Sequence, residues 1–293
     1  MLRPDGATAV AVSSGARWRD RALIAYGRSF EHPSKVRIVR WLARWLAGGR
    51  IHFRYARGAT IAIDPADYIG WAVFMTGHYE PATLGLALRI MACEPGLFVD
   101  VGAAFGWYAC AVAALADCTV VAIEPDCENC TRLRANVDLG KLSNVAVFNG
   151  AAGSKAEAVR TVRRAATNSG TVTIRPDGGF PGDWVPTLPL ETLLRRMIDP
   201  PARPILMKID VEGNEADVVA GLDLDGPFRP KNILMELEPQ LSNRSWTSFA
   251  KAREFFAGKG YDVVDVHGRP VSDPDSIAEQ NLWIRERVVQ PAA

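Results

Sequence analysis

The sequence predicts an α/β protein built on a seven-stranded, mostly parallel sheet. From residue 97 onward, short apolar runs typical of buried strands alternate with helical patterns. Such alternation indicates parallel strands joined by helices that cover both faces of one sheet. The predicted strands are residues 97–102, 118–124, 144–149, 204–210, 231–237, 261–267 and 281–286.

The last strand is expected to run antiparallel to its neighbours. Only GRPVSDPDSIAEQN separates the last two runs, which is too little helix for a right-handed crossover between parallel strands. We assign the main domain to residues 76–293, with an insertion of short β-like runs and a Gly/Pro-rich tip at residues 157–189. Such long insertions often close over ligands.

A basic extension, residues 1–75, precedes this domain. Residues 1–60 hold 12 Lys and Arg against 3 Asp and Glu, although the whole chain has a net charge of only +1. Residues 1–32 show few periodic signals and are expected to form a loose arm. PSKVRIVRWLARWLAGGR then predicts an amphipathic helix with a possible cap at Ser34 and a stop at Gly48, and RIHFRYARGATIAIDP predicts a hairpin.

The arginines of this helix, Arg37, Arg40 and Arg44, share one side. We expect a solvated stripe on a helix that packs against the main domain. The alternative is attraction to an anionic lipid surface or an acidic acceptor, which would make the protein a peripheral membrane protein.

Composition favours a cytoplasmic protein. The chain is 48% hydrophobic, and Asp100 interrupts its best candidate for a membrane span. Its N-terminus lacks the core of a signal peptide, and five cysteines are an odd number, so we expect reduced thiols. Cys127 and Cys130 form a CxxC without a second pair, and they are interpreted as ordinary thiols.

An acid stands beside a glycine turn in LFVDVGAAFGWYACAVAAL, residues 97–115. Asp100 precedes Gly102 and Gly106, which permit a tight turn before a helix that points its N-terminus at the site. A carboxylate about 4 Å from a phosphate would cost on the order of 4 kcal/mol at an effective dielectric constant of 20. The turn therefore favours a cationic ligand, and S-adenosylmethionine carries both an ammonium and a sulfonium group.

A second acid, Glu124, ends the next strand, 24 residues beyond Asp100. Nucleoside-binding α/β folds place a carboxylate there to accept hydrogen bonds from ribose hydroxyls. Further acids end the fourth and fifth strands in MKIDVEG and MELEP. Because the carboxyl ends of parallel strands share one edge of a sheet, these acids are expected to converge on a single site.

The chain resembles the FkbM-type methyltransferases, a branch of the class I S-adenosylmethionine-dependent enzymes. The most distinctive matching segment is KIDVEGNE, residues 208–215, and the matches span about 160 residues in the expected order. The matching segments are GHYEP (77–81), FVDVGAAFGWYA (98–109), AIEPD (122–126), LPLETLL (188–194), MKIDVEGNEADVVAGL (207–222) and MELEP (235–239).

This resemblance implies a Rossmann-like methyltransferase that methylates a hydroxyl of a sugar, a glycan or glycolipid, or a polyketide-like product. One position departs from the family, because Ala104 stands where an Asn is usual, and this removes an amide from the pocket. The cofactor-binding residues expected from the motifs and from the resemblance are Glu80, Asp100, Gly102, Ala103, Gly106, Glu124, Pro125, Asn149, Ala151 and Asp210.

Methylation of a weakly acidic hydroxyl benefits from a general base. The candidates are Asp210, Glu212, Glu236, His78 and His267. A divalent cation is possible but not implied, with Asp210, Glu236 and Glu238 as its ligands. Alternatively, these acids form ion pairs with Lys208 or with the N-terminal arginines.

Two other functions stay open at this point. One is a nicotinamide-dependent oxidoreductase on a similar fold, and the other is a non-catalytic module that binds a membrane or a glycan. Nucleic acid is not an expected partner, since the basic residues are concentrated in the arm and no aromatic-proline catalytic turn follows the fourth strand. The oligomeric state and the identity of the acceptor stay open.

Overall fold

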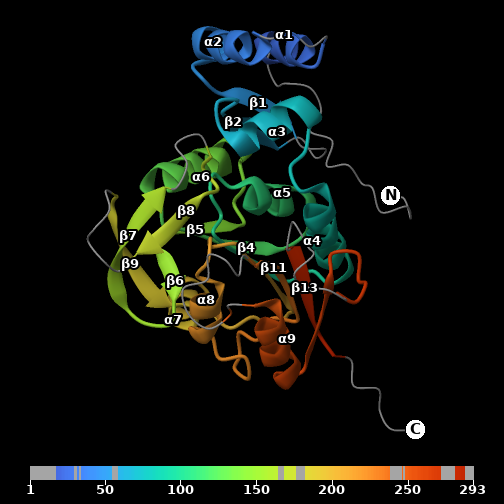
Figure 1. Cartoon of the computed structure of the whole chain (residues 1–293), viewed down its shortest axis with the longest axis vertical. Coiled ribbons are helices and arrows are strands. Elements are labelled where there is room, and N and C mark those ends of the chain that lie inside the picture. Colours follow the sequence, from blue (N-terminus) through green and yellow to red (C-terminus); the bar gives the residue numbers. More distant parts are fainter. Residues whose placement is uncertain are drawn as a thin grey trace.

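The structure, a computed structural model, describes residues 18–29, 32, 34–54, 59–163, 168–175, 182–237, 246, 248–271 and 281–287. Its centre is a seven-stranded sheet with the order β12-β13-β11-β10-β3-β4-β5 (Figure 1). All seven predicted strands form. They are β3 (Leu97–Val101), β4 (Thr119–Glu124), β5 (Val145–Asn149), β10 (Ile205–Ile209), β11 (Asn232–Glu236), β12 (Tyr261–Asp265) and β13 (Asn281–Glu286).

The pairing of the strands confirms the expected topology. β5, β4, β3, β10 and β11 run parallel, whereas β13 lies antiparallel between β11 and β12. The strand order reverses at β3, since the next strands along the chain lie on one side of it and β10 lies on the other. Such a switch point is where open α/β sheets bind ligands.

Helices cover both faces of the sheet. Because side chains alternate along a strand, Leu97, Val99 and Val101 pack against one face. Phe98 packs on the opposite face of the sheet. Asp100, two residues further along the strand, points to the same face as Phe98. On the Phe98 face lie α3 (Tyr68–Thr76), α4 (Pro81–Cys93), α5 (Trp107–Leu115) and α6 (Cys127–Gly140), and on the other lie α7 (Leu190–Met197), α8 (Glu215–Ala220) and α9 (Phe249–Gly258).

The N-terminal extension is more ordered than the sequence indicates. The expected loose arm is wrong for Trp18–Gly27, which form helix α1, while residues 1–17 lie outside the described part. Leu23 and Ile24 stabilise this helix by packing into the core. The predicted amphipathic helix is α2 (Lys35–Ala47) and the predicted hairpin is β1 (Ile51–Arg54) with β2 (Thr60–Ile63).

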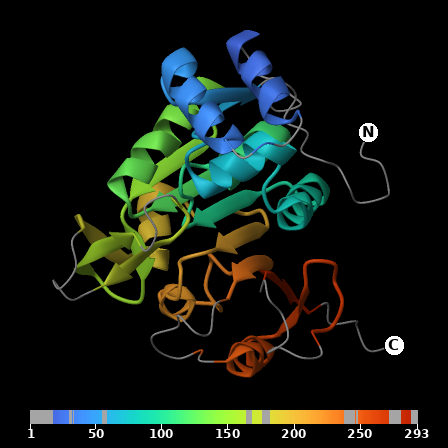
Figure 2. The ribbon, with the colours of Figure 1, turned by 45° about the horizontal axis from the view of Figure 1, so that its top comes forward.

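The ends of α2 fit the prediction in part. Gly48 ends the helix with a left-handed conformation, but the side chain of Ser34 makes no capping hydrogen bond. Helices α1 and α2 lie at the end of the molecule opposite to α9 (Figures 1 and 2). None of the helices in the described part is long and apolar enough to span a membrane, and all five cysteines are free.

The insertion builds a second sheet beside the first. Its strands, in the order β6-β9-β7-β8, begin just after β5 and so add a short segment to the predicted insertion. Most of the Gly/Pro-rich tip, residues 176–181, lies outside the described part. The strands are β6 (Ala151–Gly153), β7 (Glu157–Arg163), β8 (Val172–Arg175) and β9 (Trp184–Pro189).

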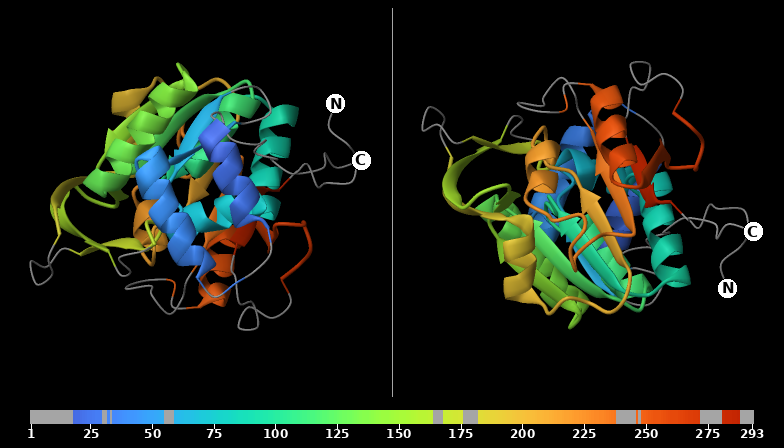
Figure 3. Two further views of the ribbon diagram at one scale, coloured as in Figure 1. Left: turned by 90° about the horizontal axis from the view of Figure 1, so that it is seen from above. Right: turned by 90° about the horizontal axis from the view of Figure 1, so that it is seen from below.

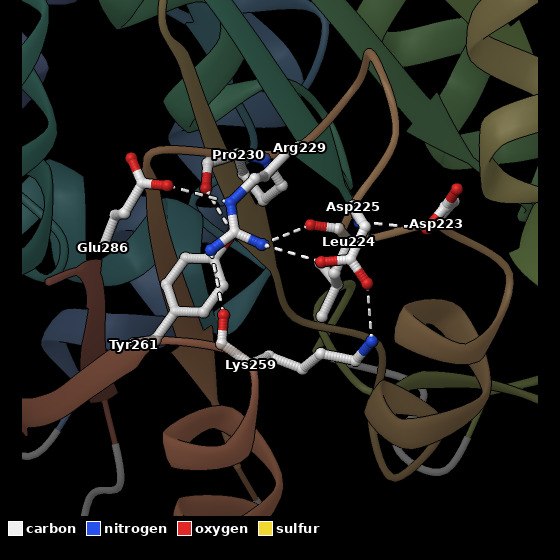
Figure 4. Close-up of polar contacts among 8 residues, drawn as sticks. All are labelled: Asp223, Leu224, Asp225, Arg229, Pro230, Lys259, Tyr261 and Glu286. Carbon is white, nitrogen blue, oxygen red and sulfur yellow. Dashed lines mark hydrogen bonds and ion pairs between the residues drawn. The ribbon is translucent and has the colours of Figure 1, made fainter.

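Arg229 connects the antiparallel edge of the sheet to the loop that precedes β11 (Figure 4). Its Nε donates to Glu286 on β13 at 2.9 Å, and its other nitrogens donate to the carbonyl groups of Lys259, at 2.9 Å, and Leu224. The guanidinium also lies 4.6 Å from the ring centroid of Tyr261 on β12. These contacts gather at the edge where β11 and β12 begin, so they stabilise the sheet without reaching the other edge.

Candidate active site

The turn after β3 needs positive φ values, which residues with a side chain rarely adopt. Gly102 has a φ of +86°, and a Cβ there would lie 1.8 Å from the backbone oxygen of Asp210. Gly106 has a φ of +92° and is the N-cap residue directly before α5. Ala104 has a φ of +47°, and its backbone N donates to Oε2 of Glu124 at 2.8 Å. The turn therefore packs directly between the ends of β10 and β4.

Asp100 lies buried within the sheet and not at the mouth of the turn. Its side chain is 1% exposed, and neither carboxylate oxygen has a hydrogen-bond partner among the described residues. It pairs in register with Lys208 on the parallel strand β10, so the two side chains stand on the same face. Burial raises the pKa of Asp100 to about 6, although Lys208 opposes this rise.

Lys208 is a buried ammonium surrounded by acids. Its Nζ lies 2.7 Å from Oδ2 of Asp210 and 4.6 Å from the ring centroid of Tyr108. Burial alone would lower the pKa of Lys208, but Asp210, Asp100 and Glu80 together raise it above its usual value. The ion pair that the sequence left as an alternative for Asp210 is therefore formed.

Glu80 holds a third carboxylate at this site from the start of α4. Its φ of +44° is unusual for a side-chain-bearing residue. Oε2 accepts a hydrogen bond from the Tyr108 hydroxyl at 2.6 Å, and Oε1 accepts one from Asn281 on β13 at 3.4 Å. Burial raises the pKa of Glu80. The antiparallel strand thus contributes to the site.

Glu124 is occupied by backbone donors at the end of β4. Its side chain is 3% exposed, and its oxygens accept from the N atoms of Ala104 and Asp126, each at 2.8 Å. Burial raises the pKa of Glu124 to about 8. Asn149 donates to the carbonyl oxygens of Glu124 and Pro125 at 3.0 and 3.2 Å, so it braces this turn.

A small apolar slot of about 20 Å³ lies next to the Glu124 turn. The insertion closes one side of it through β8, where the Thr173 hydroxyl donates to the carbonyl oxygen of Glu212 at 3.0 Å. The apolar residues that line the slot are Val101, Ile123, Pro125, Ala151, Ala152, Val172, Ile174 and Val211.

A larger cavity of about 350 Å³ opens at the carboxyl ends of β3, β10 and β11. Five of its lining residues are acids, whereas Lys208 is the one cation among the described residues that line it. Such a cavity favours a positively charged ligand. Of the residues expected from the sequence, those that line it are Glu80, Asp100, Gly102, Ala103, Asp210, Glu212 and Glu236.

The extension and the insertion supply further walls of this cavity. Asp67 joins them, because its Oδ1 accepts from the N atom of Ile69 at 3.1 Å while its Oδ2 accepts from the N atom of Ser169 at 2.6 Å. This carboxylate is buried. The wall residues from these two segments are Tyr68, Ile69, Asn168, Gly170 and Thr171.

Several candidates lie away from the cavity lining. His78 contacts the hydroxyl of Thr76 at 3.4 Å, and His267 is exposed in the turn after β12. Glu238 lies outside the described residues. Within the described part of the chain, no group of three or more His, Cys, Asp and Glu is placed to hold a metal ion.

Sequence reasoning missed the aromatic residues and the two amide side chains that line this cavity. Trp107 donates to the carbonyl oxygen of Tyr79 at 3.2 Å, which fixes the segment that carries Glu80. Tyr79, Trp107 and Tyr108 had a signal in the motifs, since Tyr79 precedes Glu80 in GHYEP and the other two follow the glycine turn. The aromatic and amide lining residues that were missed are Tyr68, Tyr79, Phe105, Trp107, Tyr108, Asn168 and Asn281.

The sheet has the strand order and the antiparallel last strand of a Rossmann-like methyltransferase of class I, and acids flank its glycine turn. The family described as "Methyltransferase FkbM domain" matches residues 100–263, more than half of the chain. The chain therefore belongs to the FkbM methyltransferase family, which confirms the resemblance and favours S-adenosylmethionine-dependent methylation over the oxidoreductase and binding-module alternatives.

Solved structures of other methyltransferases are only distantly similar to this chain. Precorrin-6y C5,15-methyltransferase from Geobacter metallireducens is 14% identical, with 70% of this chain and 85% of that chain covered and a TM-score of 0.37. TYW2 from P. horikoshii, in complex with MeSAdo, is 15% identical, with 92% and 90% covered and a TM-score of 0.40. At these scores the likeness carries no argument about the acceptor. A comparison with curated proteins found no match.

Proposed function

We propose that this methyltransferase transfers a methyl group to a hydroxyl of a sugar, a glycan or glycolipid, or a polyketide-like product. The observation that carries the proposal is the buried Asp100 carboxylate, which lies beside Lys208 in an acidic cavity at the switch point of the sheet. We also propose that residues 76–293 form the catalytic domain and residues 1–75 an extension of it.

The residues present fit S-adenosylmethionine. Asp100 and Glu80 would hold the methionyl ammonium, since Asp100 has spare acceptor oxygens and the cavity carries an excess of acids. Glu124 would accept from the ribose hydroxyls in exchange for its backbone donors, and the apolar residues Pro125 and Ala151 line the slot next to it. When bound, the cofactor supplies an electrophilic methyl group.

The acceptor side of the cavity favours a hydroxyl. A carboxylate acceptor would be repelled by the lining acids, and an amine would be held there as a poorly nucleophilic ammonium. An uncharged hydroxyl can instead donate a hydrogen bond to Asp210 or Glu236 and lose its proton to one of them. Lys208 holds the Asp210 carboxylate in place at the cavity through their 2.7 Å contact.

Product analysis tests the class of acceptor. The purified chain is incubated with methyl-labelled S-adenosylmethionine and a panel of sugars, glycolipids and polyketide alcohols, and the products are treated with alkali. We expect label that survives alkali, as an ether does and an ester does not. Label that is lost in alkali, or that is found on nitrogen, would contradict the proposal.

Variants then test the acid assignments. Asp210→Asn and Glu236→Gln should each retain donor binding by calorimetry, and at least one of them should lower kcat by about 100-fold or more. Asp117→Asn is the matched control, because this acid is exposed and lies before β4, at the opposite edge of the sheet. Full activity in both variants would show that neither Asp210 nor Glu236 is the general base.

A further inference from the structure

The outer side of the N-terminal helices carries exposed aromatic side chains. Trp18 on α1 is 74% exposed, and Trp41 and Trp45 on α2 are 61% and 76% exposed. The rings of Trp41 and Trp45 stack with their centroids 6.0 Å apart and an interplanar angle of 7°. Burial of large aromatic side chains is favourable, so three of them left in water on two adjacent helices need an explanation.

These tryptophans are placed away from the core of the protein. Helix α2 buries Lys35, Val39 and Ala43, and at 100° per residue Trp41 and Trp45 fall on the opposite side. On α1, Trp18 likewise lies opposite to the buried residues.

Arginines surround the aromatic side chains. Arg37 and Arg44 are exposed and lie on the same side of α2 as Trp41 and Trp45, and α1 adds the exposed Arg19 and Arg21. Among the described residues from 18 to 50, the single acid is Asp20, which is 1% exposed. We call Trp18, Arg37, Trp41, Arg44 and Trp45 the Trp/Arg face.

The position of the Trp/Arg face suits contact with a flat surface. Seen from above, α1 and α2 lie side by side across the top of the molecule, and they form its outermost layer (Figure 3). They also pack against each other, with Arg19 donating to the carbonyl oxygen of Leu46 at 3.4 Å. The two helices can therefore meet one plane together.

We infer that the Trp/Arg face binds the surface of a bilayer that contains anionic phospholipids. Tryptophan rings are favoured at the level of lipid headgroups, and arginines beside them attract the lipid phosphates. A second copy of this chain is a poorer occupant, because it would bring one arginine-rich face against another. The inference does not depend on the methyl donor or on the acceptor.

Cosedimentation of the full chain with vesicles tests this inference. Vesicles of phosphatidylcholine alone are compared with vesicles in which one quarter of the lipid is phosphatidylglycerol, at low salt. We expect binding to the anionic vesicles only, with weaker binding as salt is added. No binding of the folded chain to the anionic vesicles at low salt would overturn the inference.

Variants locate the binding surface. Trp41→Ser with Trp45→Ser should lower the partition coefficient at least tenfold, and replacing Arg37 and Arg44 by Gln should lower it about fivefold for each arginine. Trp184→Ser is the matched control, because Trp184 is 52% exposed and stands next to an arginine, Arg160, elsewhere on the surface. This control should bind as the unmodified chain does.

Two further outcomes would overturn the inference. One is that both double variants bind like the unmodified chain, or that the control loses as much binding as they do. The other is that light scattering finds a dimer that the tryptophan double variant converts to a monomer, since the face would then be an interface between copies. Because the tryptophans are exposed, these substitutions should leave the unfolding free energy nearly unchanged.

Discussion

The Nζ atom of Lys208 lies 2.7 Å from Oδ2 of Asp210, while Asp100 stands beside Lys208 in the register of the adjacent strand. One ammonium thus serves two carboxylates in a site where Lys208 is 3% exposed and Asp100 is 1% exposed. This arrangement keeps several acids together at the carboxyl edge of the sheet. It also makes the stability of the protein depend on a single cation.

Replacement of Lys208 by methionine should destabilise the fold. The variant keeps the length of the side chain but leaves Asp100 and Asp210 without their cation, and uncompensated buried charge costs about 3 kcal/mol or more. Urea unfolding measures the loss. Lys155→Met is the control, because its pair with Glu157 is on the surface and should cost less than about 1 kcal/mol. Equal losses in the two variants would refute this view of Lys208.

The unliganded protein should lose stability as the pH rises from about 4 to about 8. Burial raises the pKa of Asp100 to about 6 and that of Glu124 to about 8. In this window the folded state therefore holds protons that the unfolded chain has released, so its unfolding free energy falls with increasing pH. Urea unfolding at about pH 5 and about pH 8 measures this fall in the unfolding free energy. The fall should be smaller for Glu124→Gln than for the unmodified chain. An equal fall in the two proteins would argue against a raised pKa for Glu124.

Ala104→Gly should stabilise the fold. Ala104 has a φ of +47°, where a Cβ costs about 1 kcal/mol or more and glycine fits without strain. The Asn that is usual in the family at this position tolerates this conformation better than alanine. Thermal unfolding should therefore occur at a higher temperature in Ala104→Gly, while the control Ala103→Gly, at ordinary φ, should be less stable than the unmodified chain. A lower Tm in both would contradict this expectation.

Arg229→Ala should weaken the sheet without affecting the cavity. It removes the hydrogen bonds to Glu286 and to two carbonyl groups, at a cost of about 2 kcal/mol. Arg229→Lys should restore little of this, since an ammonium lacks the planar fork that reaches three acceptors. The expected result is a lower Tm with unchanged donor affinity. A marked loss of donor binding would show that this edge is coupled to the site.

Alternation along the chain was enough to predict the sheet. Each strand was found because its apolar run is bounded by turn residues, and the antiparallel last strand followed from the short GRPVSDPDSIAEQN connection. Helix α1 was missed because it buries little beyond Leu23 and Ile24, while Asp20 and Gly27 occupy other inward positions and weaken the periodic pattern.

The sequence predicted those site residues that lie in the motifs at the strand ends. Asp100, Asp210 and Glu236 lie at strand ends, so topology alone brings them to one edge. Tyr68 and Asn168 come from the extension and the insertion, and their approach depends on the buried Asp67 contact, which no local pattern encodes. The left-handed conformations of Glu80, Ala104 and Glu212, which cluster at the cavity, are likewise visible only in three dimensions.

Calorimetry with S-adenosylhomocysteine tests the central claim most directly. The claim is that Asp100 and Glu124 hold opposite ends of the methyl donor. The unmodified chain should bind one equivalent, Asp100→Asn and Glu124→Gln should each weaken binding by about tenfold or more, and Asp117→Asn should bind normally. Absence of binding by the folded, unmodified chain, or unchanged affinity in both cavity-side variants, would contradict it.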